Sequence, residues 1–448
     1  EIDYVFLGEA DLTFPPVVEQ ILAGKRPELP PGVVGRESDS SSRPPALAAP
    51  DPGRFMVRDM DALPYPDFDD YFRRRDASPL KDEIHSTLFF ETSRGCWWGQ
   101  KHHCKFCGLN GSTLVFRSKN PKRAVDELRY LVERHGVNKA CSSDNILDYR
   151  YFDTFLPMLK EADIGLAFVF EMKTNMTRRQ VEILIEAGMG AAQLGIETFI
   201  TSVLKLIGKG ASAVQNLQTL KWFSEHEIEV KWNVLYGFPG ENPEDYATLA
   251  ELIPSIVHLA PPLAVGRVRL DRFSPYFDDP GAHGMANPRP NKAFLYVYPF
   301  PDDVLRRLAY YYEYDYADGR NPLDYAAPAL RQIEAWQELN RTVTLRQWDR
   351  PDGVLILTDT RPGAAEFQRR LTGLDRELYL YCDRGRSLER ILEHAAAQSD
   401  ADSVDQAAVQ RTLDHWVGER IMACLDGRYL SLALRTHSSD NNPAGRTE

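Results

Sequence analysis

The chain has 448 residues, of which 43% are hydrophobic, enough for two or three domains with at least one large core. Its formal net charge of −12 argues against a protein that coats nucleic acid, because phosphate binding needs a concentrated positive field. No stretch approaches the roughly 20 apolar residues that span a bilayer, and the N-terminus lacks a signal-peptide layout. We therefore expect a soluble, cytoplasmic protein with no membrane and no nucleic-acid partner.

The first part of the chain predicts a single strand and helix followed by a linker. It opens with Glu1 rather than Met, and residues 1–24 read as a strand, a turn and a helix over 15–22. One strand and one helix cannot make a domain, so we expect residues upstream. Residues 27–53 are rich in Pro, Gly, Ser and Ala, which cannot bury enough apolar surface to order themselves, and the predicted linker covers 27–84.

The middle of the chain, residues 85–290, predicts an α/β fold. Apolar runs alternate with amphipathic segments, a pattern typical of βα units around a parallel sheet. The expected strands cover 88–91, 139–142, 165–170, 191–195, 230–235 and 265–270, and the expected helices cover 121–135, 151–161, 178–187, 211–226 and 243–259. Together they predict a partial (β/α)6 barrel, with the chemistry at the C-terminal ends of its strands.

Residues 291–448 predict a helical, winged-helix-like C-terminal domain. Two helices followed by a hairpin around the Asp426-Gly427 turn are the basis of this prediction. In chain order we expect a Tyr-rich helical stretch, a strand, two helices and the hairpin, at 300–340, 354–358, 387–396, 405–420 and 421–433.

Three of the six cysteines lie within twelve residues, on a loop that follows a predicted strand: Cys96, Cys104 and Cys107. This crowding favours metal ligation over a disulfide framework. Three thiolates satisfy three irons of a [4Fe–4S] cube and leave the fourth iron open for an exogenous ligand. The alternatives are a zinc site completed by His102 or His103, which would indicate a binding module without catalysis, and a set of buried thiols.

The cysteine segment resembles the radical S-adenosylmethionine (SAM) superfamily, although seven residues separate Cys96 from Cys104 where three are usual. Further motifs in the superfamily's order extend over residues 88–275. The resemblance implies that the three cysteines hold a [4Fe–4S] cluster. It also implies that SAM is contacted by Phe106, Asp144, Asn145, Glu171, Lys173, Asn175, Gly195, Glu197 and Gly237.

Each of these assignments has an ordinary structural alternative. The Ser143-Asp144-Asn145 run is also a good helix cap, and the charges of the Glu171 to Asn175 segment are also typical of a solvated loop. The turn that contains Gly237 precedes a predicted helix, which is common architecture.

A closer resemblance links the chain to cobalamin-dependent radical SAM enzymes that mature ribosomally made peptides. It rests on residues 95–99, 103–111 and 143–148, and residues 63–71 look like the interdomain passage of that family. Residues 4–11 resemble the last strand and turn of its Rossmann-like cobalamin domain. Residues 1–26 are therefore predicted to end such a domain, with Gly8 and Glu9 as cobalamin contacts. No Asp-x-His-x-x-Gly run supplies an axial histidine.

The resemblance implies an activity. An external one-electron reductant such as flavodoxin or ferredoxin would reduce the cluster, SAM would be cleaved, and the 5′-deoxyadenosyl radical would take hydrogen from an unactivated carbon. Methylcobalamin would then methylate that carbon in a ribosomally synthesised precursor peptide. Cyclopropane formation, epimerisation and methylthiolation of nucleic acid are alternatives. No catalytic acid or base is singled out, and the C-terminal domain would either hold a leader peptide by strand addition or cap the barrel.

Overall fold

The computed structural model describes residues 2–35, 55–111, 113–226, 228–398 and 405–436. The chain divides into two compact units. The first contains Glu1–His103 and Gly108–Phe170, and the second contains Cys104–Cys107 and Glu171–Glu448. Within the described ranges, no helix combines the length and apolar character needed to cross a membrane.

The first unit begins with a small antiparallel pair of strands, β1 (Tyr4–Phe6) and β2 (Val33–Gly35), beside the helix α1 (Phe14–Leu22). The prediction that residues 27–53 are only linker is therefore wrong for β2. Its Val33 is buried, and Leu7 donates a 2.8 Å backbone bond to Gly32, so pairing with β1 orders a segment of otherwise loop-like composition. Residues 36–54 of the predicted linker lie outside the described residues.

The remainder of the predicted linker also contains regular structure. A 3₁₀ turn covers Met60–Ala62, and α2 covers Asp69–Asp76. Val57, Met60 and Leu63 are buried together in a small apolar cluster. These apolar side chains explain why the segment folds although its surroundings are rich in Pro and Asp.

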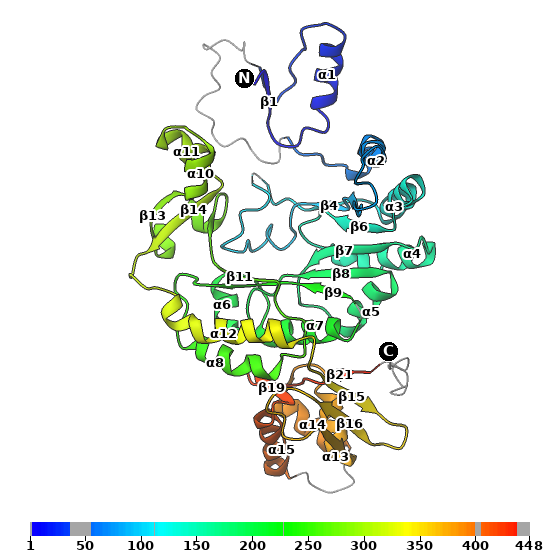
Figure 1. Cartoon of the computed structure of the whole chain (residues 1–448), viewed down its shortest axis with the longest axis vertical. Helices are drawn as coiled ribbons and strands as arrows, with labels where there is room; N and C mark the ends of the chain where they lie inside the picture. The colour runs from blue at the N-terminus through cyan, green and yellow to red at the C-terminus, as the bar shows by residue number, and fades with distance from the viewer. Residues whose placement is uncertain (1, 36–54, 112, 227, 399–404, 437–448) are drawn as a thin grey trace. The chain divides into compact units, whose positions relative to one another are not determined.

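The parallel strands of the first unit run in the order β3, β6, β7, and α3 and α4 pack against each other beside them (Figure 1). Helix α3 starts where Asn120 caps it and ends at Gly136, which adopts a left-handed conformation. The bounds are β3 Leu88–Phe90, β4 Ser93–Arg94, β5 Arg117–Ser118, α3 Pro121–His135, β6 Lys139–Ser142, a 3₁₀ turn Tyr149–Phe152, α4 Phe155–Ala162 and β7 Ala167–Met172.

The second unit continues the alternation of strands and helices, with β8 parallel to β9 and β10 parallel to β11. Capping boxes at Thr177 and Ser212 start α5 and α7. The bounds are α5 Arg178–Glu186, β8 Met189–Leu194, α6 Thr201–Leu206, α7 Ala213–Ser224, β9 Glu229–Lys231, β10 Asn233–Tyr236, α8 Asp245–Leu252, β11 Ala264–Arg267 and β12 Leu270–Asp271. The protein is thus of the α/β class with parallel strands.

Three predicted elements in this region are shorter than expected. The strand over 230–235 is split at the buried Trp232 into β9 and β10, and the strand over 265–270 is split into β11 and β12. The helix predicted over 243–259 ends at Leu252 and is followed by a 3₁₀ turn over Ile253–Ser255. Pro254 explains this end, because proline cannot donate a helical hydrogen bond.

The prediction of a helical stretch over 300–340 is wrong in part. Tyr311–Tyr316 forms the strand β14, antiparallel to β12 and β13, and its tyrosines at 312, 314 and 316 are buried with the period of two of a strand. The other elements are α9 Pro275–Asp278, β13 Met285–Pro290, α10 Lys292–Val297, α11 Asp302–Leu308 and α12 Leu323–Leu339, and α12 packs on α8.

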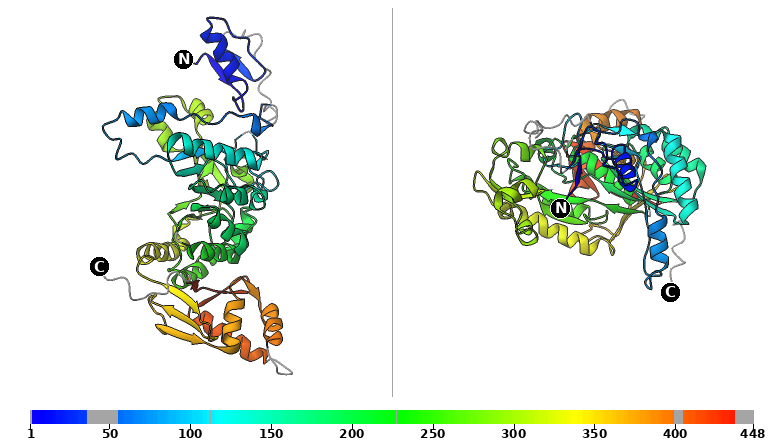
Figure 2. Two further views of the ribbon diagram at one scale, coloured as in Figure 1. Left: turned by 90° about the vertical axis from the view of Figure 1, so that its right-hand side faces the viewer. Right: turned by 90° about the horizontal axis from the view of Figure 1, so that it is seen from above.

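The last part of the second unit contains the expected strand, helix pair and hairpin, drawn in orange to red in Figure 2. It also contains strands and a helix that the sequence did not predict, and its sheet has the order β17, β16, β15, β21. The bounds are β15 Leu345–Asp349, β16 Leu355–Asp359, β17 Gln368–Leu371, α13 Gly373–Tyr381, β18 Arg386–Ser387, α14 Leu388–Ala397, α15 Gln406–Gly418, β19 Met422–Leu425, β20 Arg428–Ser431 and β21 Leu434–Arg435.

Candidate functional site

Cys96 belongs to the first unit and lies on the turn that follows β4. Gly99 donates its backbone N–H to the Cys96 sulfur at 3.3 Å, and the Cys96 N–H is bonded to Leu114 O at 3.3 Å. The preceding Gly95 has φ of +81°, and a Cβ there would lie 2.2 Å from the Val115 carbonyl oxygen. The turn therefore requires glycine, and it directs an N–H group at a sulfur atom, which stabilises a thiolate.

Cys104 and Cys107 belong to the second unit and lie on a tight turn. The Cys107 N–H donates to Cys104 O at 3.0 Å. Lys105 between them anchors the turn on both sides: its N–H donates to Ile207 O at 2.9 Å, and its carbonyl accepts from the Tyr276 N–H at 3.0 Å. Both cysteines are partly exposed residues and form no disulfide, as metal ligation requires.

The donor set of these three thiols, with one iron position left for another ligand, fits a [4Fe–4S] cluster. Across the described ranges, no three His, Cys, Asp or Glu side chains are already grouped as a metal site. His102, one candidate for the fourth ligand of a zinc site, packs its ring on Trp98 with centroids 4.3 Å apart.

Lys209 joins several of the predicted SAM contacts in the second unit. Its ammonium forms a 2.6 Å ion pair with Glu197 and lies 5.8 Å from the centroid of the Phe106 ring. Burial lowers the pKa of Lys209, but the charges of Glu197, Cys104 and Cys107 outweigh burial and raise it overall. Lys209 therefore keeps its positive charge close to the Cys104 to Cys107 turn.

Gly195 follows β8 at a place where no side chain fits without displacing a neighbour. Its N–H donates to Met172 O at 2.9 Å, and an added Cβ would lie 2.8 Å from Lys209 Nζ. Two residues later Glu197 adopts φ of +61°, uncommon for a residue other than glycine, and its carbonyl accepts the Leu235 N–H at 2.9 Å. Both positions therefore lie next to the ion pair of Glu197 and Lys209.

The residues that end and follow β7 also interact with Lys209. Glu171 accepts a 2.8 Å hydrogen bond from Gln193. Burial raises the pKa of Glu171 overall, although that hydrogen bond and the charge of Lys209 act to lower it. Lys173 is buried and donates to the carbonyl oxygen of Lys209. Asn175 is half-buried after the strand. Thus Glu171 and Lys173 are both linked to Lys209, which the sequence did not single out as a site residue.

Gly237 has a structural partner of its own. Its N–H and that of Phe238 donate to the Glu241 carboxylate at 3.0 and 2.9 Å, and an added Cβ would lie 2.7 Å from the Tyr316 hydroxyl. These contacts favour the ordinary-turn alternative for Gly237. The buried Phe238 ring lies 5.9 Å from that of Phe106, and neither Phe238 nor Lys209 could be assigned from spacing alone.

Asp144, a predicted SAM contact, supports the loop that leads to Cys96. Its carboxylate accepts from the Thr92 N–H at 2.8 Å, from the Thr92 hydroxyl and from the Ser93 hydroxyl at 2.9 Å. Burial raises the pKa of Asp144 to about 6, although these hydrogen bonds lower it. Because three donors already surround this carboxylate, a structural role is favoured.

A polar cavity of about 390 Å³ in the first unit brings together Asn145, Gly8 and Glu9. Asn145 donates to Asn110 Oδ1 at 2.7 Å, and the Asn110 Nδ2 atom is buried without a partner among the described residues. Glu9 accepts from Arg117 at 2.7 and 2.9 Å, so burial, which raises its pKa, is outweighed and the pKa is lowered. A predicted SAM contact and the predicted cobalamin contacts therefore line one cavity.

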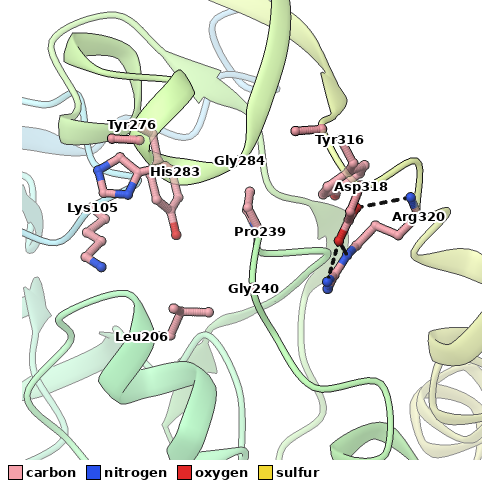
Figure 3. Close-up of a pocket in the computed structure, with 12 residues that line it drawn as sticks. Lys105, Leu206, Pro239, Gly240, Tyr276, His283, Gly284, Tyr316, Asp318 and Arg320 are labelled. Atoms are coloured by element: carbon pink, nitrogen blue, oxygen red, sulfur yellow. Dashed lines mark hydrogen bonds and ion pairs between the residues drawn. The ribbon is translucent and has the colours of Figure 1, made fainter.

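A second cavity, of about 410 Å³, lies in the second unit next to Lys105 of the cysteine turn (Figure 3). Tyr276 is buried there, and its hydroxyl has no hydrogen-bond partner in the part of the chain that the structure describes. The Tyr276 and His283 rings are 5.0 Å apart. Arg320 is paired with Asp318 at 2.6 Å across the cavity from Lys105, beyond Pro239 and Gly240 in the view.

Comparisons with known proteins relate part of the chain to one superfamily. Residues 90–253 match the family model of the radical SAM superfamily. The chain is 25% identical over 256 residues to the uncharacterized methyltransferase PH0819 of Pyrococcus horikoshii, which covers 54% of this chain and 51% of the relative. It is also 25% identical over 146 residues to the anaerobic magnesium-protoporphyrin IX monomethyl ester cyclase of Synechocystis sp. This match covers 32% of this chain and 28% of the relative.

The chain spans about half the length of the first of these relatives and less of the second. Among solved structures, it resembles the radical SAM methyltransferase TsrM of Kitasatospora setae with a TM-score of 0.49 at 15% identity, over 75% of this chain and 67% of TsrM. It also resembles the cobalamin-dependent SAM radical enzyme OxsB with a TM-score of 0.46 at 12% identity, over 82% and 54%.

Proposed function

We propose that Cys96, Cys104 and Cys107 hold a [4Fe–4S] cluster used for reductive cleavage of SAM, in a chain whose residues 90–253 match the family model of the radical SAM superfamily. One observation carries this proposal: Lys209 lies close to the Cys104 to Cys107 turn, which contains Phe106, and also next to Gly195, which has no side chain. When bound, the cluster would supply one electron to the sulfonium and an open iron for the amino and carboxylate groups of SAM.

The residues of this chain have separate roles in that site. Lys209 places a positive charge near the Cys104 and Cys107 thiols, which favours their thiolate form. Gly195 leaves backbone open to a flat ligand such as adenine, and Phe106 offers a ring face at the same place. Glu197, held in its ion pair with Lys209, offers a carboxylate to a ribose hydroxyl.

We further propose that the reaction is methylation of an unactivated carbon in a ribosomally made peptide, with cobalamin as methyl carrier. Support comes from the cysteine-segment motifs and from the methyltransferase name of the Pyrococcus relative. Gly8 and Glu9 are the proposed cobalamin contacts. Both also have structural roles, since a Cβ on Gly8 would lie 2.7 Å from Phe55 O and Glu9 is paired with Arg117.

Iron content and SAM cleavage test the first proposal. Anaerobically purified protein should contain about four irons per chain, and dithionite with SAM should release 5′-deoxyadenosine. Alanine at Cys96, Cys104 or Cys107 should remove both iron and cleavage, whereas Cys424→Ala, at an exposed cysteine of β19, should keep both. Colourless protein with one zinc, or a cysteine variant that retains cluster and cleavage, would contradict the proposal.

Mass spectrometry tests the second proposal. Corrinoid should bind the protein and be released on denaturation, and a precursor peptide encoded beside this gene should gain the mass of one methylene. Loss of two hydrogens would instead indicate ring formation, and unchanged mass with an altered stereocentre would indicate epimerisation. An RNA product carrying a methylthio group would overturn the peptide assignment.

A further inference from the structure

A cavity of about 880 Å³ in the second unit is lined by four arginines and a single described acidic residue. Arg384 and Arg386 lie on the segment that leads into α14, Arg390 lies in the first turn of that helix, and Arg428 is the first residue of β20. The acidic residue among the described lining residues is Glu389. The lining therefore carries an excess of positive charge in a chain whose net charge is −12.

The arginines have few acidic partners. Arg384 has no hydrogen bond or ion pair within the described ranges. Arg386 donates to Tyr381 O at 3.2 Å, and Arg428 donates to Gly385 O at 3.3 Å, but carbonyl oxygens do not neutralise a guanidinium. Arg390 alone has a carboxylate partner, Glu393 at 2.8 Å, and that pair is exposed to solvent and therefore weak.

Buried contacts hold this basic segment against α7. Asp383 pairs with Arg178 at 2.8 Å and with Lys221 at 2.9 Å, and the Gly385 N–H donates to Gln218 at 2.9 Å. A Cβ on Gly385 would lie 2.5 Å from Val214, so the backbone approaches the helix closely. The guanidiniums are thus kept together by the fold although they repel one another.

The geometry disfavours a nucleic acid. Single-stranded nucleic acids need exposed aromatic faces on which bases stack. Tyr381 is the aromatic residue of this lining, and its ring is stacked on His394 at 3.9 Å while the Arg386 guanidinium lies 4.0 Å from its centroid. Two groups at such distances from one centroid must occupy opposite faces, so no face is left for a base.

The geometry also limits strand addition. Strand β18 is an edge of its sheet, but it covers only Arg386 and Ser387, and both residues already pair with β20 on their other side. A two-residue edge offers few main-chain hydrogen bonds to an added strand. Side-chain charge is therefore the stronger recognition feature here.

We propose that this arginine cavity binds an acidic segment of a polypeptide, whose carboxylates pair with the guanidiniums of Arg384, Arg386 and Arg428. Guanidinium and carboxylate form two parallel hydrogen bonds, which a simple surface charge does not provide. The identification of that polypeptide as the substrate peptide, held away from the carbon that is modified, rests on the proposed function. The binding itself does not.

Fluorescence anisotropy on the full chain tests the cavity without cluster, SAM or reductant. The probe is a labelled peptide with glutamates at alternate positions, and its twin has glutamine in their place. The glutamate peptide should bind, and its affinity should fall as the salt concentration rises to about 300 mM, since screening reduces charge pairing. The glutamine peptide should bind at least about tenfold more weakly.

Variants locate the binding. Arg384→Gln and Arg428→Gln should each lower the affinity for the glutamate peptide about tenfold. Arg384→Lys should recover only part of the affinity, because lysine cannot make the paired contact. The matched control is Arg307→Gln on α11, which is likewise an exposed arginine and is paired with Asp303, and this variant should bind like wild type. Unchanged thermal midpoints should show that the variants fold.

Several outcomes would overturn the proposal. These are no binding of the glutamate peptide at millimolar concentration, equal binding of its glutamine twin, or no effect of the arginine variants. Tighter binding of a single-stranded oligonucleotide lost in the same variants would indicate a nucleic-acid site, and full displacement of the peptide by millimolar pyrophosphate would indicate a small-anion site. A protein that fails to cleave SAM but binds the glutamate peptide would refute the proposed function alone.

Discussion

Glu197 and Lys209 form an ion pair of 2.6 Å whose side chains are exposed by only 15% and 12%. Glu197 reaches this position through a left-handed backbone conformation directly after β8, and Lys209 reaches it from the loop that follows α6. Each charge is therefore held where the other is its main compensation.

Lys209→Met should destabilise the protein, because Glu197 would remain as an uncompensated, largely buried charge. We expect a loss of about 3–5 kcal/mol in the free energy of unfolding, measured by urea titration. The double variant Lys209→Met with Glu197→Gln should recover part of that loss. Equal losses in the single and double variants would show that the two side chains are not coupled.

Gly195→Ala should weaken SAM binding more than it weakens folding. The added Cβ meets the flexible end of Lys209 at 2.8 Å, which can shift, so the folding cost should stay below about 2 kcal/mol. The same Cβ covers the backbone proposed to face adenine, and SAM affinity by calorimetry should fall about tenfold. Gly266→Ala in β11, where a Cβ meets nothing within 4 Å, is the matched control and should leave affinity unchanged.

Asp144 should make stability fall as pH rises from about 4 to about 6. Its pKa is raised from 3.8 to about 6 in the folded protein, so the native state binds more protons than the unfolded state in this interval. The slope from this group can reach about 1.4 kcal/mol per pH unit. Asp144→Asn should remove that slope, while Asp163→Asn, at an exposed turn after α4, should keep it. A wild-type curve that rises over this interval and is unaltered by Asp144→Asn would refute the assignment.

Asp383 should have the opposite pH dependence. Burial raises its pKa, but Lys221, Arg178 and Arg435 outweigh burial and lower it below its usual range. Its stabilisation is therefore fully present above the unfolded pKa of 3.8 and is lost as pH falls through the folded pKa. Asp383→Asn should cost about 3–5 kcal/mol at neutral pH, because it leaves the fully buried Lys221 without its carboxylate.

The same variant should lose less at a pH well below 3.8, because part of the stabilisation by wild-type Asp383 is already lost there. Urea titrations of both proteins at pH 7 and at low pH measure this difference. An equal loss at both pH values would mean that Asp383 stabilises the protein by shape rather than by charge.

The sequence alone determined the features that depend on neighbouring residues. Helix α3 occupies the predicted residues 121–135 because Asn120, Pro121 and Gly136 mark its ends locally, and β6 likewise covers the predicted 139–142. The motifs of residues 88–275 resemble the radical SAM superfamily although the cysteine spacing is unusual for it, and residues 90–253 match the superfamily's family model. Such signals are readable because ligand type, caps and periodicity are encoded within short stretches.

Tertiary structure decided the rest, because long-range contacts choose among local possibilities. Strand β2 exists through its pairing with β1, and β14 is a strand through its pairing with β12 and β13, although both lie in segments expected to be linker or helix. Arg428 joins Arg384 across 44 positions of the chain only because β20 of the hairpin folds back to pair with β18. Charge that is spread along a sequence becomes a site only when packing forces like side chains together and leaves them without counterions.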